Sequence, residues 1–239
     1  MDRFEQSKEV FNQLFGPLPE DEVDPELMEI LRRFIFGDVF HTGELDHQTR
    51  ELITVTILAT LQTIPQLKAH LFSCINVGVS PVELREAIYQ LAPFIGFPRT
   101  LNAIEALNEL FGFMKIDAPL PGMATVEDDQ RYDKGLEIQR ELYGSEIEDK
   151  FDYLEAIPKF HAEFIFGDFY TRDGMEIQTR ELLKLVTLTA LGTSGIKECI
   201  QANLKLGTTK ETLYETIIQC IPYVGFPQCV DVIEEINKI

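Results

Sequence analysis

The apolar residues of this chain recur at helical spacing, and no segment alternates as a half-buried strand does. Over residues 49–61 they cover most of the circumference of a helix, which is typical of a helix buried on several sides. After Pro65 an apolar stripe continues toward Gly78, a residue suited to a helix end. Its members, at i, i+4, i+7 and i+8, are Leu67, Leu71, Cys74 and Ile75. The pattern predicts an all-α protein.

Residues 80–83 predict the start of a further helix. Ser80 is a favoured N-cap, Pro81 suits the first helical position, and Glu83 completes a capping box. The apolar spacing extends this helix to about Leu91.

Four stretches of sequence recur in the same order, which indicates an internal duplication. The offset between the copies stays between 128 and 130 residues, so only short insertions or deletions separate them. The matched stretches are residues 3–16 with 131–144, FIFGDVF (34–40) with FIFGDFY (164–170), QTREL (48–52) with QTREL (178–182), and APFIGFP (92–98) with IPYVGFP (221–227).

The duplication predicts two tandem units of about six helices each. We place the first unit at residues 1–114 and the second at 131–239. The intervening residues 115–130 read as a linker, because they carry two prolines, a glycine and an acidic cluster. Two copies of one fold are expected to pack about a pseudo-twofold axis, as a fused dimer.

Composition and charge narrow the function. The 239 residues are 45% hydrophobic and 26% charged, and the net charge is −19, which disfavours nucleic acid and anionic membranes as partners. No window reaches the roughly 18 apolar residues of a membrane span. The first residues lack the apolar core of a signal peptide, so a cytoplasmic location is expected. Neither the four cysteines nor the four histidines show metal-ligand spacing, so we expect no metal.

The charged pairs of the two QTREL copies, Arg50-Glu51 and Arg180-Glu181, are candidates for chemistry. A charged pair at a helix start is most often solvated. Here the rest of the helix is apolar on nearly all faces, so we expect the pair to contact other elements, where a partly buried glutamate can act as an acid or base. His70 lies one position off the apolar stripe, which suits a structural as well as a catalytic histidine.

These features together resemble the carboxymuconolactone decarboxylase family, which includes the alkylhydroperoxidase AhpD branch. The resemblance rests on four stretches: Arg-Glu-Leu at the start of a helix, the QLKxH helix, the NVGVSPxEL turn and the Gly-Phe-Pro segment. It covers residues 3–114 and returns over residues 131–238. It implies two AhpD-like helical units.

The resemblance also implies which chemistry is present. The peroxidase branch has a Glu, two Cys and a His at fixed spacing, and Glu51 and His70 match that spacing while Thr63 and Gln66 stand at the cysteine positions. A peroxidase needs a thiolate at this place, so that mechanism is absent there. In the second unit Glu181 is retained, and Cys199 stands where the first unit has His70.

The decarboxylase branch therefore fits better, and implies a cofactor-independent lyase that removes CO₂ from a small lactone-type acid. Glu51 and His70 would move protons, and Arg50, Arg99 or Lys68 would bind a substrate carboxylate. Two alternatives stay open: a thiol-dependent peroxidase that uses Cys199, and a non-catalytic protein that binds a small ligand. The second unit, with Arg180, Glu181 and Cys199, is expected to be the less complete site. The resemblance further implies a homo-oligomer, preferably a trimer of tandem chains.

The distance between Glu51 and His70 in space does not follow from their spacing. In a simple antiparallel hairpin turning near Ile64, Glu51 lies farther from the turn than His70, by roughly 10 Å at 1.5 Å per residue. Either the two helices cross or each residue meets a partner elsewhere.

Overall fold

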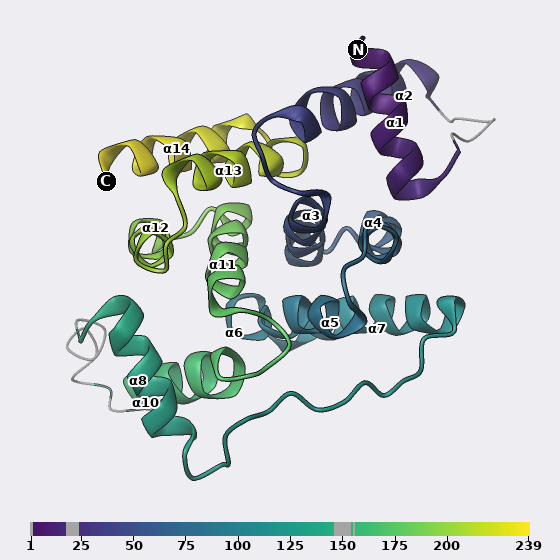
Figure 1. The fold of residues 1–239 in the computed structure, drawn as a ribbon. Helices are drawn as coiled ribbons and strands as arrows, with labels where there is room; N and C mark the ends of the chain where they lie inside the picture. Colours follow the sequence, from purple (N-terminus) through teal and green to yellow (C-terminus); the bar gives the residue numbers. More distant parts are fainter. Residues whose placement is uncertain (1, 18–23, 146–153, 155) are drawn as a thin grey trace.

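The computed structural model describes residues 2–17, 24–145, 154 and 156–239, and these residues form helices and connections without a strand (Figure 1). The first unit contains α1 (Arg3–Phe15), α2 (Pro25–Arg32), η1 (Arg33–Asp38), η2 (Val39–His41), α3 (His47–Leu61), α4 (Ile64–Asn76), α5 (Pro81–Tyr89), α6 (Ala92–Ile95) and α7 (Phe97–Met114). The second contains α8 (Arg131–Tyr143), α10 (Ala156–Phe160), η3 (His161–Tyr170), α11 (Ile177–Leu191), α12 (Ile196–Lys205), α13 (Lys210–Val224) and α14 (Phe226–Lys238). The all-α, tandem architecture is confirmed.

Side-chain caps fix where the site-bearing helices begin. The Asp46 carboxylate accepts a hydrogen bond from the backbone N–H of Thr49 (2.7 Å) and caps α3, directly before the first QTREL. The Ser80 hydroxyl accepts the N–H of Glu83 (3.1 Å) and caps α5, as the sequence predicts. The local sequence therefore sets the position of Glu51 along α3.

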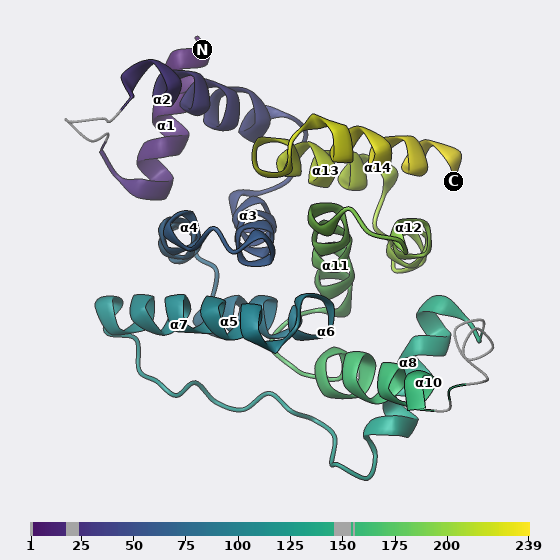
Figure 2. The ribbon, with the colours of Figure 1, turned by 180° about the vertical axis from the view of Figure 1, so that it is seen from behind.

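The two units share one hydrophobic core. Figures 1 and 2 show α3 and α11 side by side at the centre, between α13 and α14 on one side and α5 to α7 on the other. One continuous cluster of buried side chains includes Ile57 and Leu71 of the first unit and Leu185 and Ile217 of the second. Smaller clusters lie under α1 and α8, at opposite corners of the molecule. This arrangement is that of a fused dimer.

A buried ionic cluster joins the units near α5. Glu86, fully buried on α5, accepts hydrogen bonds from Arg172 (2.7 Å) and from Arg180 (3.3 Å), both of the second unit. Burial alone would raise the pKa of Glu86, but the hydrogen bond from Arg172 and the charges of both arginines hold that pKa below its ordinary value of 4.5. The carboxylate is therefore charged at neutral pH and ties the units together.

The pseudo-symmetric position on α13 makes a matching contact. Glu215 accepts the backbone N–H groups of Glu44 (2.8 Å) and Leu45 (3.0 Å), in the loop that leads into α3 of the first unit. Gly43 of this loop has a φ of +77°, and an added Cβ would lie 2.0 Å from the Glu215 carboxyl carbon. A side chain here would displace the Glu215 carboxylate from these hydrogen bonds, and the positive φ also favours glycine. Each unit thus contacts the loop before the other unit's central helix.

The linker packs against both units. The chain between α7 and α8 runs as an extended strap (Figure 1). Arg85 donates to the backbone carbonyl of Pro121 (2.8 Å), and the Met123 carbonyl accepts the N–H of Asp173 (3.0 Å). No helix of the described residues is long and apolar enough to span a membrane.

We predict that Glu86→Ala lowers the free energy of unfolding by about 3–5 kcal/mol, because it leaves buried arginines without their counter-ion. Urea denaturation at pH 7 measures the change. The surface variant Glu235→Ala, which removes an exposed partner of Lys238, serves as the control and should change stability by less than about 1 kcal/mol.

The Glu86 carboxylate also makes the difference in unfolding free energy between wild type and Glu86→Ala depend on pH. Because the pKa of Glu86 is lowered in the folded protein, its contribution is present above about pH 4.5 and is lost as the pH falls through the folded value. The difference in unfolding free energy between wild type and Glu86→Ala, the stability gap, should therefore decrease as the pH falls. A gap that is absent at pH 7, or that widens in acid, would contradict the account.

Candidate active site

The arginine and glutamate of the first QTREL point to different partners. The Arg50 side chain donates to Gln219 on α13 of the second unit (3.1 Å). The Glu51 side chain, 0% exposed, lies against α4 of its own unit. Consecutive helical residues diverge by about 100°, so one short motif serves both the unit interface and a site.

Glu51, His70 and Ser73 form a hydrogen-bonded group. The Nδ1 atom of His70 lies 2.8 Å from Oε2 of Glu51, and the Ser73 hydroxyl donates to the same oxygen. Because the carboxylate accepts, Nδ1 is the donor, and the Nε2 atom is left to exchange a proton with a bound molecule. His70 is 8% exposed, so its side chain is largely buried.

The site geometry answers the question left by the spacing. Ser73, nine residues after the start of α4, lies at nearly the same depth from the turn as Glu51, ten residues before the end of α3. His70 lies one helical turn closer to the turn and reaches the carboxylate with its ring. The two helices pack directly, and the long side chains of Glu51 and His70 span the offset.

Two aromatic rings hold His70 edge-on. The Phe15 ring of α1 lies 5.2 Å from the imidazole centroid at 89°, and the Tyr223 ring of α13 lies 5.8 Å away at 90°. Tyr223 belongs to the second unit, so the site is built at the interface. The sequence analysis missed Tyr223, although the APFIGFP and IPYVGFP repeat marks its position opposite Phe94 in the other copy.

In the second unit the corresponding glutamate is enclosed by donors. Glu181, 0% exposed, accepts the hydroxyls of Tyr143 and Tyr170 (2.7 Å to the latter) and the Cys199 thiol (3.2 Å). The ammonium of Lys184 lies 3.5 Å from Oε1 and also donates to Tyr143. Both oxygens of this carboxylate are therefore engaged, and the sequence analysis missed Lys184.

Electrostatics keep this second cluster closed to proton transfer. Burial would lower the pKa of Lys184, but the Glu181 charge raises it above its ordinary value. Burial also raises the pKa of Glu181, and the Lys184 charge offsets part of this rise. We assign an ion pair, because the lysine and three further donors all contact this one carboxylate. Burial and the Glu181 charge raise the pKa of Cys199 well above its ordinary value, so its thiol stays protonated.

The cations predicted to bind substrate either contact other residues or lie outside the group formed by Glu51, His70 and Ser73. The Arg50 guanidinium is 1% exposed, and its other hydrogen bonds go to the backbone carbonyls of Val39, Thr42 and Leu45. Arg180 donates to Glu86 through Nη2, while its Nε and Nη1 atoms have no partner among the described residues. Arg99 is exposed in the first turn of α7, and the exposed Lys68 pairs with Glu109. The buried donors of Arg50 therefore already have protein partners, which gives no support to the expectation that this residue binds a substrate carboxylate.

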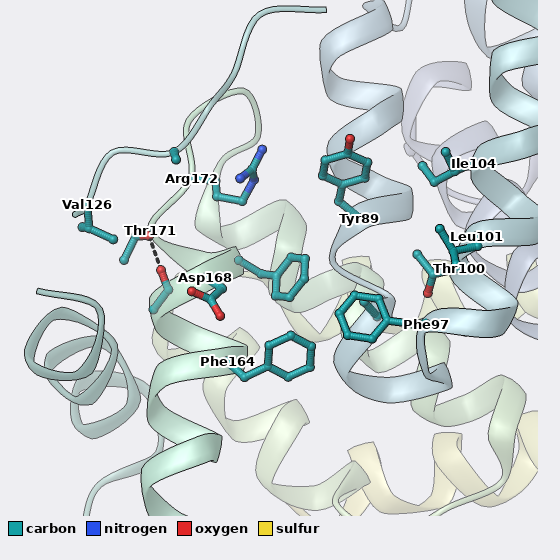
Figure 3. Close-up of a pocket in the computed structure, with 14 residues that line it drawn as sticks. Tyr89, Phe97, Thr100, Leu101, Ile104, Val126, Phe164, Asp168, Thr171 and Arg172 are labelled. Atoms are coloured by element: carbon teal, nitrogen blue, oxygen red, sulfur yellow. Dashed lines mark hydrogen bonds between the residues drawn. The ribbon is translucent and has the colours of Figure 1, made fainter. Parts of the chain in front are cut away.

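A separate apolar pocket of about 500 Å³ lies between the units beneath the linker (Figure 3). Phe97, Leu101 and Phe164 form much of its wall. Its charged side chains are already paired, Arg172 with Glu86 and Asp168 with Arg131. Glu51 and His70 do not line it, so this pocket has no direct part in their chemistry.

The described residues contain no group of three or more His, Cys, Asp and Glu side chains arranged to hold a metal ion. All four cysteines are buried free thiols.

Comparison with known proteins matches both halves of the chain to one family. The model of the carboxymuconolactone decarboxylase family matches residues 25–109 and 155–237. A 4-carboxymuconolactone decarboxylase of Acinetobacter baylyi is 32% identical over 108 residues, which span 43% of this chain and 81% of that protein. A nitrosuccinic acid decarboxylase of Metarhizium robertsii is 29% identical over 76 residues, which span 32% of this chain and 53% of that protein.

The fold has a solved counterpart of nearly the same length. A crystal structure described as a gamma-carboxymuconolactone decarboxylase subunit from Burkholderia xenovorans LB400 superimposes with a TM-score of 0.63, covering 97% of this chain and 95% of that one. At 18% identity this likeness concerns the fold alone. The family assignment rests on the two matched regions and on the Acinetobacter relative. The chain belongs to the carboxymuconolactone decarboxylase family.

Proposed function

We propose that the chain is a cofactor-independent carboxy-lyase whose acid-base pair is Glu51 and His70. The substrate is a small acid whose carboxyl group is joined to an electron-accepting group. The observation that carries the proposal is the 2.8 Å contact between His70 Nδ1 and the buried Glu51 carboxylate. A histidine oriented in this way by a carboxylate is a recurrent proton donor and acceptor in enzymes.

The names of the two decarboxylase relatives support this substrate class. One is named for a lactone acid and the other for a nitro acid. When either type of acid loses CO₂, the electron pair of the broken C–C bond moves toward the lactone carbonyl or the nitro group. A proton must then return to carbon, and Nε2 of His70 is the atom placed to deliver it. Glu51 stabilises the positive imidazolium before that transfer.

A cation on the departing carboxylate is unnecessary in this scheme. The carboxylate becomes neutral CO₂, so a bound arginine would stabilise the substrate more than the transition state. The aromatic walls supplied by Phe15 and Tyr223 instead give the carboxylate an apolar surrounding. Commitment of Arg50 to the unit interface is consistent with this chemistry.

The thiol-dependent alternative has little support from the surroundings of Cys199. The thiol is buried, its pKa is raised, and it donates to the Glu181 carboxylate. A peroxide-reducing cysteine needs the opposite conditions, an accessible thiolate near positive charge. We propose that the second unit is a scaffold for the first site. The ligand-binding alternative remains as an outcome of the tests below.

We predict that His70→Ala and Glu51→Gln each lower kcat by about 10²–10⁴-fold, because each removes part of the proton-transfer pair. Release of CO₂ from 4-carboxymuconolactone and from nitrosuccinate measures the effect. His41→Ala removes an exposed histidine and should leave the rate unchanged. Unaltered turnover in His70→Ala would refute the proposed roles, and wild-type binding of both acids without CO₂ release would favour the ligand-binding alternative.

A second prediction concerns Cys199. Because all four thiols are buried, a thiol reagent should react with them in the native protein only as fast as the chain opens, and completely in urea. Cys199→Ser should retain decarboxylation. Peroxide reduction by the wild type that disappears in Cys199→Ser would support the thiol-dependent alternative instead.

A further inference from the structure

Two buried polar atoms beside His70 have no hydrogen-bond partner among the described residues. One is Oε1 of Glu51, the carboxylate oxygen that faces neither His70 nor Ser73. The other is the hydroxyl of Tyr223, which comes from the second unit. A buried polar atom without a partner costs free energy, so such atoms commonly mark a place where a ligand or water binds. Here one belongs to the carboxylate that bonds His70, and the other to the tyrosine whose ring contacts His70.

The Tyr223 hydroxyl has the properties of a hydrogen-bond donor. Burial raises the pKa of Tyr223 well above its ordinary value, and the Glu51 charge raises it further. Attraction to the nearby Thr54 hydroxyl lowers the pKa of Tyr223 only in part; Thr54 itself donates to the Arg50 carbonyl (2.9 Å), and the two hydroxyls do not meet in hydrogen-bond geometry. Tyr223 therefore keeps its proton at neutral pH, and that proton is available to a bound molecule.

The two copies place their aromatic hydroxyls differently. Phe15 and Phe40 of the first unit correspond to Tyr143 and Tyr170 of the second, and both of these tyrosines bind Glu181. At the third position the order is reversed, since the first unit has Phe94 and the second has Tyr223. The first unit therefore has no tyrosine of its own at these positions, which leaves Oε1 of Glu51 without a partner among the described residues, and a single tyrosine ring reaches His70 from across the interface.

Packing does not require the Tyr223 hydroxyl. Phe94 occupies the equivalent position beside the second cluster, where its ring lies 5.7 Å from the Lys184 ammonium. A phenylalanine is thus compatible with this place in the fold, while the buried hydroxyl of Tyr223 satisfies no protein group within the described residues. A polar atom that packing does not need and no partner satisfies is best explained by a function.

We propose that Tyr223, supplied by the second unit, is a catalytic residue that stabilises the oxyanion formed during decarboxylation. This inference rests on the proposed function and adds the residue that stabilises the negative charge on the substrate oxygen. As the C–C bond breaks and CO₂ leaves, the electron pair moves to a carbonyl or nitro oxygen of the substrate. The Tyr223 hydroxyl donates a hydrogen bond to that oxygen and keeps its own proton. His70 then delivers a proton to carbon, which completes the exchange of CO₂ for hydrogen.

The kinetic test is Tyr223→Phe, which removes only the hydroxyl. Loss of one oxyanion donor should lower kcat by about 10²–10³-fold with little change in KM, because the charge develops only in the transition state. Tyr214→Phe is the matched control. It lies on the same helix and its hydroxyl bonds Asn237 (2.7 Å), outside the site, so its kcat should equal that of the wild type. A Tyr223→Phe enzyme with wild-type kcat would overturn the assignment.

A binding test separates this inference from the proposed reaction. The nitronate form of 3-nitropropanoate carries the charge that nitrosuccinate acquires when CO₂ leaves, whereas succinate lacks the acceptor group. Calorimetry should show that Tyr223→Phe weakens nitronate binding at least about 10-fold, within the range of a hydrogen bond to a charged group, and leaves succinate binding unchanged. Tyr214→Phe should affect neither ligand.

The outcomes are distinguishable. Tyr223-dependent nitronate binding without any CO₂ release refutes the proposed reaction but supports the oxyanion site. Decarboxylation that depends on His70 but not on Tyr223 supports the proposed function and overturns this inference. Equal nitronate affinity in wild type and Tyr223→Phe, or no nitronate binding to the wild type, also overturns it.

Discussion

A fully buried carboxylate must find partners for its charge, and this requirement organises both halves of the molecule. Each QTREL places a glutamate in the first turns of a central helix, where it is 0% exposed. In the second unit the requirement is met by two tyrosines, a cysteine and a lysine. In the first unit His70 and Ser73 both approach one oxygen, and the other oxygen has no partner among the residues that the structure describes. The incompletely satisfied carboxylate is the one suited to chemistry.

The arginine that precedes each glutamate explains why the two units are needed together. Arg50 and Arg180 both reach across to the opposite unit, to Gln219 and Glu86 respectively. These buried contacts set how the central helices lie against each other. The same packing brings α13 against α3, so that the Tyr223 ring reaches His70. A separated first unit would therefore lack one wall of its own site.

Much of the architecture could be predicted from the sequence, because it depends on local rules. Helical apolar spacing and the Ser80 cap define elements whose geometry follows from neighbouring residues. The family spacing paired Glu51 with His70, although the hairpin estimate could not show that they touch. Side chains long enough to bridge the offset decide that contact, and their reach is invisible in residue counts.

The parts that the sequence did not reveal depend on contacts between the units. Arg50 was expected to bind substrate, but its donors are taken by Gln219 of the second unit and by backbone carbonyls of residues 39–45 in its own unit, and a charged residue at a helix start gives no sign of these contacts. Lys184 and Tyr223 were overlooked because each lies within an apolar helical segment. A residue-by-residue comparison of the two copies would have revealed both positions. In that alignment Thr54 corresponds to Lys184, and Phe94 corresponds to Tyr223.

The central claim is that one chain carries one working site, at the first glutamate, completed by the second unit. A crystal structure of the chain with the nitronate of 3-nitropropanoate tests it most directly. The account predicts one bound molecule per chain beside His70, with a nitro oxygen about 2.7 Å from the Tyr223 hydroxyl. A molecule bound against Glu181, or molecules bound equally at both glutamates, would contradict it.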